Sequence, residues 1–245
     1  MPMDKGAYTH HISQQYNIEL DEVKTHLLQM GGMVETQVQD AISALIEADS
    51  AKANLVVATD RKINSMEVSI DEECARILAR RQPAASDLRL VLAVTKTITD
   101  LERIGDEATK IARRAIDLSE EGMAPRGYVE IRHIGEQVCK MVQEALDAFA
   151  RLDAEQALRV AQHDKAVDLE YNTAMRELVT FMMEDPRSIS RVLNVLWSLR
   201  ALERIGDHAR NIAEYVVYLV KGKDVRHVGL TEMAAQVHGS SIQDV

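Results

Sequence analysis

The chain has 245 residues, of which 46% are hydrophobic, so it can bury the core of one large domain or of two ordinary ones and is neither disordered nor fibrous. Eleven glycines and four prolines are about half of what average usage of roughly 7% and 5% would supply, and aromatic residues make up only 4%. This composition favours long helices over a β-sandwich or a base-stacking surface. A formal net charge of −10 argues against direct binding of nucleic acid.

Prolines divide the chain into helical segments. After the N-terminus they occur only at Pro83, Pro125 and Pro186, and proline rarely lies inside a helix. Between them apolar residues recur at steps of three and four, the period of an amphipathic helix. We therefore expect six helices, over residues 16–48, 51–82, 87–120, 127–151, 154–184 and 188–222.

Turn residues agree with these limits. Asp49 and Asp153 occupy equivalent turns, Ser86 is a candidate N-cap, and Gly222 is a candidate helix stop. Residues 223–245 are polar, so we expect them to form a frayed tail.

The sequence contains an internal duplication. Residues 101–106, Leu-Glu-Arg-Ile-Gly-Asp, recur identically at 202–207, and upstream residues match at a slightly larger shift, as Gly31 does with Gly135. Helices of roughly 30 residues are about 45 Å long, and short connections favour antiparallel neighbours. The chain is therefore expected to be all-α, with six long helices in two pseudo-symmetric antiparallel three-helix bundles, over residues 1–123 and 124–222, followed by the tail 223–245.

Acidic side chains occupy matching positions in the two copies. Glu102 and Asp106 lie on one helix face at the border of the apolar arc, and Glu203 and Asp207 repeat this arrangement. The preceding helix of each copy carries a second polar strip. Its members are Asp60, Asn64, Glu67 and Asp71 in the first copy. The strip of the second copy is shorter: Asp164 and Asp168 hold the positions of Asp60 and Asn64, but Tyr171 and Met175 replace the two other acids.

These repeated like charges predict a counter-ion. Two carboxylates four residues apart destabilise a helix by roughly 0.2–0.5 kcal/mol. Two neighbouring helices that offer carboxylate or amide oxygens without histidine suit Mg, Mn or Fe better than structural zinc. Gly105 and Gly206 lie beside the acids and indicate a close approach by a helix, a metal or a partner. The alternatives are close helix packing alone, and a solvated polar face on which Arg103 and Arg204 form surface ion pairs.

No catalytic constellation is present in the sequence. A ferritin-like di-iron centre needs a Glu-x-x-His from each of two helices, and the chain has one, at residues 130–133. It has no nucleophile elbow, P-loop, GxGxxG or HExxH motif. We therefore expect a protein that is not an enzyme and that binds no organic cofactor.

Cysteine usage and apolar runs indicate a cytoplasmic protein. Cys74 and Cys139 form no CxxC pair, which fits a reducing compartment. The N-terminus leads into no apolar core of a signal peptide, and no apolar run is long enough to span a membrane.

Several segments match a known family. They are residues 11–15, 30–35, 81–83, 86–89 and 220–222, together with both Glu-Arg-Ile-Gly-Asp segments. Through them the sequence resembles, over almost its whole length, the PhoU family of bacterial negative regulators of the phosphate regulon.

The resemblance implies paired three-helix bundles, often dimeric, whose acidic motifs bind iron, zinc or other metal ions such as Mn or Mg. Carried over position by position, the ligands would be Asp60, Asn64, Glu102 and Asp106 at a first site, and Asp164, Asp168, Glu203 and Asp207 at a second. Asn64 departs from the acidic form of the motif. The first site is therefore expected to be weaker, or to recruit Glu67 and Asp71.

The resemblance also implies a function and partners. Members of the family are thought to act without catalysis as adaptors between the ATPase subunit of the phosphate-specific ABC transporter and the sensor histidine kinase of the phosphate two-component system, modulating phosphate uptake. We accordingly expect a homodimer in the cytoplasm, peripheral to the inner membrane through these partners, with no nucleic acid bound. The alternatives are a metal store or metal-dependent enzyme that uses the paired acidic motifs, and a purely structural scaffold.

Overall fold

The structure, a computed structural model, describes residues 5–83 and 85–239. Every regular element in these residues is a helix, which confirms the expected all-α fold. None of these helices is long and apolar enough to cross a bilayer. In chain order they are α1 (Lys5–Glu47), α2 (Ser50–Arg81), α3 (Ala85–Glu121), α4 (Tyr128–Arg151), α5 (Ala154–Glu184), the 3₁₀ turn η1 (Pro186–Ser188), α6 (Ile189–Lys221) and α7 (Leu230–His238).

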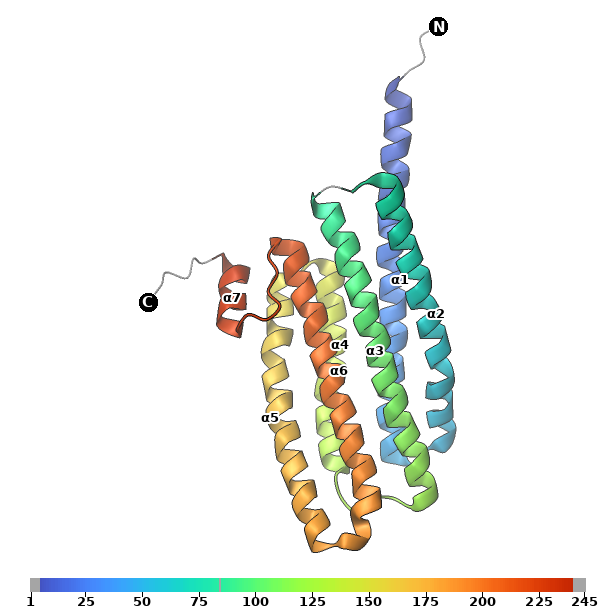
Figure 1. Ribbon diagram of the computed structural model, residues 1–245, viewed down its shortest axis with the longest axis vertical. Coiled ribbons are helices and arrows are strands. Elements are labelled where there is room, and N and C mark those ends of the chain that lie inside the picture. The colour runs from blue at the N-terminus through green and yellow to red at the C-terminus, as the bar shows by residue number, and fades with distance from the viewer. Residues whose placement is uncertain (1–4, 84, 240–245) are drawn as a thin grey trace, which may run out of the picture.

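The six long helices form two bundles that lie side by side (Figure 1). Helices α1, α2 and α3 contact one another, as do α4, α5 and α6, so each repeat folds into the expected three-helix bundle. The bundles join along two seams, α3 against α6 and α1 against α4, and the helices of each pair run antiparallel. The duplicated motif therefore lies on the two helices that meet at the centre of the molecule.

Capping residues explain several helix boundaries. The side chain of Asp49 accepts a hydrogen bond from the Lys52 amide at the start of α2, and that of Asp153 accepts one from the Gln156 amide at the start of α5, both at 2.9 Å. These bonds satisfy amide groups that have no partner within the helix. At the end of α6, Gly222 has φ 71°, a left-handed conformation that favours glycine, so the expected stop is confirmed.

Three expectations about helix limits are wrong. Helix α1 begins at Lys5, well before residue 16, and α3 begins at Ala85, so Ser86 lies inside its first turn and is not the N-cap. The tail contains α7, which packs on α5 through buried Met233 and Val237. The prediction of a frayed tail used the polar composition of the whole segment, and a few apolar residues are enough for this docking. Residues 240–245 of the expected tail lie outside the described residues.

The apolar core orients the duplicated motif. Leu101 and Ile104 of α3 and the equivalent Leu202 and Ile205 of α6 are fully buried. Successive residues of a helix are about 100° apart, so burial of these side chains places the adjacent motif residues at the edge of the core. The acidic members then face α2 or α5 of their own bundle.

Candidate metal centres

The second acidic site lies between α5 and α6. Asp164 and Asp168 of α5 and Asp207 of α6 each offer a carboxylate oxygen, and these oxygens lie within 4.8 Å of one another. Across residues 14–83 and 85–239, this is the only group of three histidine, cysteine or acidic side chains that meets that distance. The structure thus brings together three of the four residues predicted for this site.

Glu203, the fourth predicted residue, lies one turn before Asp207 on α6. Its Oε1 accepts a hydrogen bond of 2.6 Å from Arg200, whereas its Oε2 is buried with no hydrogen-bond partner in the described part of the chain. Burial first, and repulsion by Asp207 second, raise the pKa of Glu203. A buried oxygen without a partner is costly, so Oε2 is a further candidate ligand atom.

Burial and mutual repulsion disfavour the ionised form of the carboxyl groups at the second site. Asp164 is only 2% exposed, and burial, followed by repulsion from Asp168 and Asp207, raises its pKa to about 6. Burial and Asp168 likewise raise the pKa of Asp207. A bound cation would relieve this repulsion and displace protons from the raised carboxyls.

Two arginines that sequence reasoning missed partly neutralise this site. Arg210 donates a hydrogen bond to Asp164 Oδ2 at 3.3 Å and another to Glu214 Oε1 at 3.1 Å. The guanidinium of Arg200, which bonds Glu203, also lies 5.9 Å from the ring centre of Tyr171. The available signal for Arg210 was its position three residues after Asp207, on the same helix face.

The first acidic site, between α2 and α3, is more open. Asn64 Nδ2 donates to Asp60 Oδ2 at 3.4 Å, and Thr109 Oγ1 donates to Asp60 Oδ1 at 3.2 Å. Asn64 Oδ1 is buried with no partner among the residues described, like Glu203 Oε2 in the other bundle. With Asn64 in place of an acid, the first site has one negative charge fewer, and the unpartnered Oδ1 of Asn64 remains available as a metal ligand.

Glu102 and Asp106 complete the first site from α3. Burial raises the pKa of both, with repulsion by Asp106 as the next cause for Glu102 and repulsion by Asp60 as the next cause for Asp106. Glu67 also repels Glu102, and its own pKa is raised by burial and then by Asp71. Glu67 therefore interacts electrostatically with the acids of this site, whereas Asp71 is exposed to solvent.

The two motif glycines have different surroundings. A Cβ on Gly105 would lie 3.0 Å from Oε1 of the buried Gln37 side chain of α1, so any larger residue would force that side chain to shift. A Cβ on Gly206 would lie 3.6 Å from Asp164 Oδ1, an ordinary contact distance. Close packing thus explains Gly105, while nothing in the structure explains the second glycine.

The ligand atoms at both sites suit a hard cation. They are carboxylate and amide oxygens from two adjacent helices, with no cysteine or histidine among them, a set typical of Mg, Mn or Fe sites and unlike structural zinc. The unpartnered oxygens of Asn64 and Glu203 are the observation that favours such a ligand at each site. The residues present therefore fit a metal ion.

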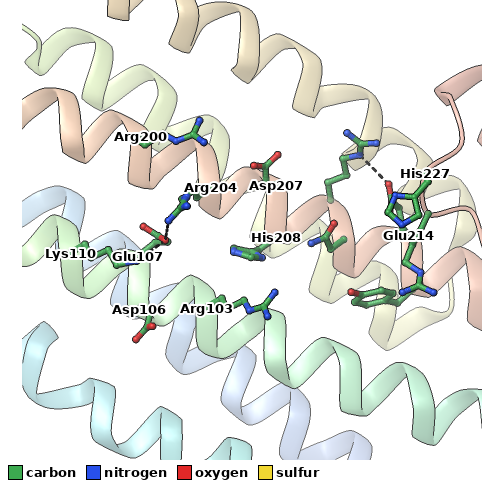
Figure 2. Close-up of a pocket in the computed structure, with 14 residues that line it drawn as sticks. Arg103, Asp106, Glu107, Lys110, Arg200, Arg204, Asp207, His208, Glu214 and His227 are labelled. Carbon is green, nitrogen blue, oxygen red and sulfur yellow. Dashed lines mark hydrogen bonds and ion pairs between the residues drawn. The ribbon is translucent and has the colours of Figure 1, made fainter.

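A cleft of about 840 Å³ follows the α3/α6 seam between the two sites (Figure 2). Asp106 of the first site and Asp207 of the second both border it. Across the seam Arg204 donates to Glu107 Oε1 at 3.1 Å (Figure 2). The motif arginines Arg103 and Arg204 thus line the seam, and the ion pair of Arg204 is with the other bundle rather than with its own acids.

Comparison with known proteins gives a consistent result. The PhoU domain model matches residues 27–115 and 131–216, one match in each repeat. A Pseudomonas putida protein described as a phosphate-specific transport system accessory protein PhoU homolog is 68% identical over 242 residues, which cover 99% of this chain and 94% of the relative. The phosphate-specific transport system accessory protein PhoU of Escherichia coli (strain K12) is 48% identical over 231 residues, 94% of this chain and 95% of the relative.

Solved structures share both fold and sequence with the chain. The crystal structure of PhoU from Pseudomonas aeruginosa superimposes with a TM-score of 0.84 at 70% identity, covering 85% of this chain and 100% of that one. PhoU from Streptococcus pneumoniae, described as a phosphate transport system regulatory protein, has a TM-score of 0.79 at 32% identity, covering 86% and 99%. By its two matched domains and its full-length relatives, this chain is a member of the PhoU family.

Proposed function

We propose that this protein is an accessory protein of a phosphate-specific transport system and a negative regulator of the phosphate response. The observation that carries the proposal is the near full-length similarity to proteins described as phosphate-specific transport system accessory proteins. Its bundles are matched as a pair, so the proposal concerns the whole two-bundle unit.

In this proposal the protein acts without catalysis, as an adaptor. It binds the ATPase subunit of the phosphate ABC transporter and the sensor histidine kinase, keeps the kinase silent when phosphate is plentiful, and moderates phosphate uptake. It works in the cytoplasm and reaches the inner membrane through these two partners. A sequence without a nucleophile elbow, P-loop or HExxH motif supports a binding role.

Deletion of the gene tests the regulatory role. At high phosphate the deletion strain is expected to express kinase-dependent genes that the parent strain represses, and a plasmid copy should restore repression. Kinase output that is unchanged by deletion would contradict the proposal. Co-purification of the tagged protein from membrane extracts at high and low phosphate then tests the adaptor mechanism, because both partners should elute with it in a phosphate-dependent manner.

We further propose that the two acidic sites bind hard metal ions, with the more compact second site binding more tightly. The cluster of Asp164, Asp168 and Asp207 supports this, as does the unpartnered oxygen of Glu203. Bound metal would neutralise the buried carboxylates and hold α5 against α6. Titration with Mn²⁺ or Fe²⁺, together with metal analysis of the purified protein, should show at least one occupied site, and absence of binding at millimolar metal would contradict it.

A metal store or metal-dependent enzyme is the second candidate function, and the same acidic cluster favours it. Sustained turnover or metal storage that is lost when Glu102→Ala is combined with Glu203→Ala would support this candidate. Full regulatory activity of the metal-free protein would contradict it while leaving the adaptor role intact.

We also propose that the protein forms a homodimer. A dimer would present each partner-binding surface twice, which is compatible with the adaptor role. Sedimentation at micromolar concentration tests it. A dimer mass is expected, and a monomer at all concentrations would reject the proposal.

A further inference from the structure

The cleft between α3 and α6 is rich in cations, although the protein as a whole is acidic. Six arginine and lysine side chains line it against four carboxylates, in a chain whose formal net charge is −10. The cations are Arg103, Lys110, Arg200, Arg204, Arg210 and Arg226. Cations outnumber carboxylates in this lining, and an excess of one sign of charge concentrates ligands of the opposite sign. The cleft therefore favours an anion.

The gene duplication and the antiparallel packing together create this concentration of charge. Arg103 and Arg204 occupy the same position in the two copies of the motif, between the glutamate and the aspartate. In each copy the acids face the preceding helix, and the arginine lies on the side that meets the other bundle. Because α3 and α6 run antiparallel, the two arginines reach one cleft from opposite walls (Figure 2).

Within the part of the chain that the structure describes, ion pairs engage five of the six cations and leave one free. Arg200 is paired with Glu203 at 2.6 Å and Arg226 with Asp224 at 2.5 Å. Glu107, which is 5% exposed, accepts hydrogen bonds from Lys110 at 2.8 Å and from Arg204 at 3.1 Å. Glu214 is similarly paired with Arg210 at 3.1 Å. In contrast, the guanidinium of Arg103 has no hydrogen bond or ion pair with any residue from 14 to 83 or 85 to 239.

A buried polar group holds the cleft walls in place. Asp100 of α3 is 3% exposed, and one of its oxygens lies 2.7 Å from His208 Nδ1 and accepts a hydrogen bond from Asn211 Nδ2 at 3.1 Å. Both partners are on α6, so this contact joins the bundles beside the cleft. The second copy has Ala201 where the first has Asp100, so the brace is formed once. A rigid cleft spares an incoming ligand the cost of ordering its site.

We infer that this cleft binds the phosphoryl group of a small anion, either inorganic phosphate or a phosphate-bearing metabolite such as a nucleotide. Guanidinium groups bind tetrahedral oxyanions through paired hydrogen bonds, and Arg103 has its donors available. The volume of about 840 Å³ lies in the range of small-molecule sites, roughly 300–1,000 Å³. The choice of phosphate among oxyanions rests on the proposed function, whereas the location of the anion site rests on the cleft.

Calorimetric titration of the purified protein with inorganic phosphate, ATP and sulfate tests this inference. Phosphate or ATP is expected to bind with one site per chain, and Arg103→Gln should weaken that binding by about tenfold or more, because a charge-assisted hydrogen bond is lost. Arg103→Lys, which keeps the charge but loses the planar fork, should give an intermediate affinity. Arg159→Gln is the matched control, since Arg159 is an exposed arginine on α5 that does not line the cleft.

The titrations also separate the sources of the phosphoryl group. Binding of phosphate alone identifies the free ion, and tighter binding of ATP identifies a nucleotide. The inference is overturned if neither ligand binds at millimolar concentration, if sulfate binds as well as both, or if Arg103→Gln and Arg159→Gln behave alike. Thermal unfolding of each variant without ligand shows that any loss is not a folding defect. Failure here would leave the regulatory role untouched, because that role is tested by kinase output in the deletion strain.

Discussion

The two bundles carry the same duplicated motif but build different acidic sites from it. On α3 and α6 the acids are identical, with Glu102 and Asp106 matched by Glu203 and Asp207. The difference lies on the facing helices, where Asn64 in α2 corresponds to Asp168 in α5. The second site is therefore a tight cluster of three carboxylates, whereas the first has an amide in the place of one of them.

Their charge compensation differs as well. Thr109 offers the first site a neutral hydroxyl, and the equivalent Arg210 offers the second site a positive charge that reaches buried Asp164. The compact cluster thus has an arginine hydrogen-bonded to one of its acids. At the first site, where burial is the main cause of the raised pKa of Glu102 and of Asp106, the charges of Arg103 and Arg113 oppose that rise without such a bond. Duplication therefore reproduced the backbone and the six-residue motif, while residues outside the motif set the charge of each site. These residues are Asn64 and Asp168 on the facing helices and Thr109 and Arg210 on the motif helices.

The largest expected effect concerns Asp164, whose pKa is raised to about 6 mainly by burial. A carboxyl whose pKa is raised by folding binds more protons in the folded state than in the unfolded state. The free energy of unfolding therefore falls as pH rises from about 4 to about 6, and the loss is complete above that range. In metal-free protein, Asp164→Asn should therefore raise the free energy of unfolding by up to about 3 kcal/mol at pH 7 and by little near pH 4. Urea unfolding across this pH range checks it.

The matched change in the first bundle is Asp106→Asn, because burial also raises the pKa of Asp106. It should act in the same direction. A variant Asp164→Asn that is less stable than the wild type at pH 7 would show that Arg210 outweighs the burial of the carboxylate.

Exchanging the residue that distinguishes the sites should exchange their metal affinities. Asp168→Asn removes one charged ligand from the second site and is expected to weaken metal binding by at least the roughly 10–100-fold that loss of an outer-shell partner costs. Asn64→Asp should strengthen the first site in the same measure. Mn²⁺ titration of both single variants and of the double variant tests this prediction. If the second site still binds Mn²⁺ more tightly than the first in the double variant, the prediction is wrong.

Removing the counter-cation should affect the second bundle more than the first. Arg210→Met leaves Asp164 and Glu214, both under 10% exposed, without their partner. The cost is about 2 kcal/mol, below the roughly 3–5 of a fully buried pair, because Arg210 itself is 35% exposed. Thr109→Val, which removes a neutral hydrogen bond, should cost about 1 kcal/mol. Equal losses in chemical unfolding would show that the two sites do not differ in compensation.

The smallest expected effect is one that the bundles share. Asp49→Ala and Asp153→Ala each remove an N-cap hydrogen bond of 2.9 Å, and each should lower the free energy of unfolding by about 1 kcal/mol. Thermal unfolding of both variants measures the losses. If the two variants lose clearly different free energies of unfolding, the two caps differ in strength although their hydrogen bonds have the same length.

Local patterns predicted most of the fold and part of the sites. The turn signals at Asp49, Asp153 and Gly222 mark real helix ends, because capping depends on residues close in sequence. Helix α7 escaped prediction because only its docking on α5 through Met233 and Val237 makes a short polar segment helical. The acidic pairs were found by their spacing, although the difference between a tight and an open cluster needs the position of the facing helix.

Periodicity and self-similarity are properties of the chain, so they predict the all-α class, the two repeats and the helix face on which Glu102, Asp106, Glu203 and Asp207 lie. The antiparallel contact of α3 with α6, in contrast, depends on how the folded helices pack. That contact places Arg103 and Arg204 in a common cleft, pairs Glu107 with the other bundle, and buries Asp100 against His208. Contacts between residues about a hundred positions apart depend on how whole helices pack, and no local pattern encodes them.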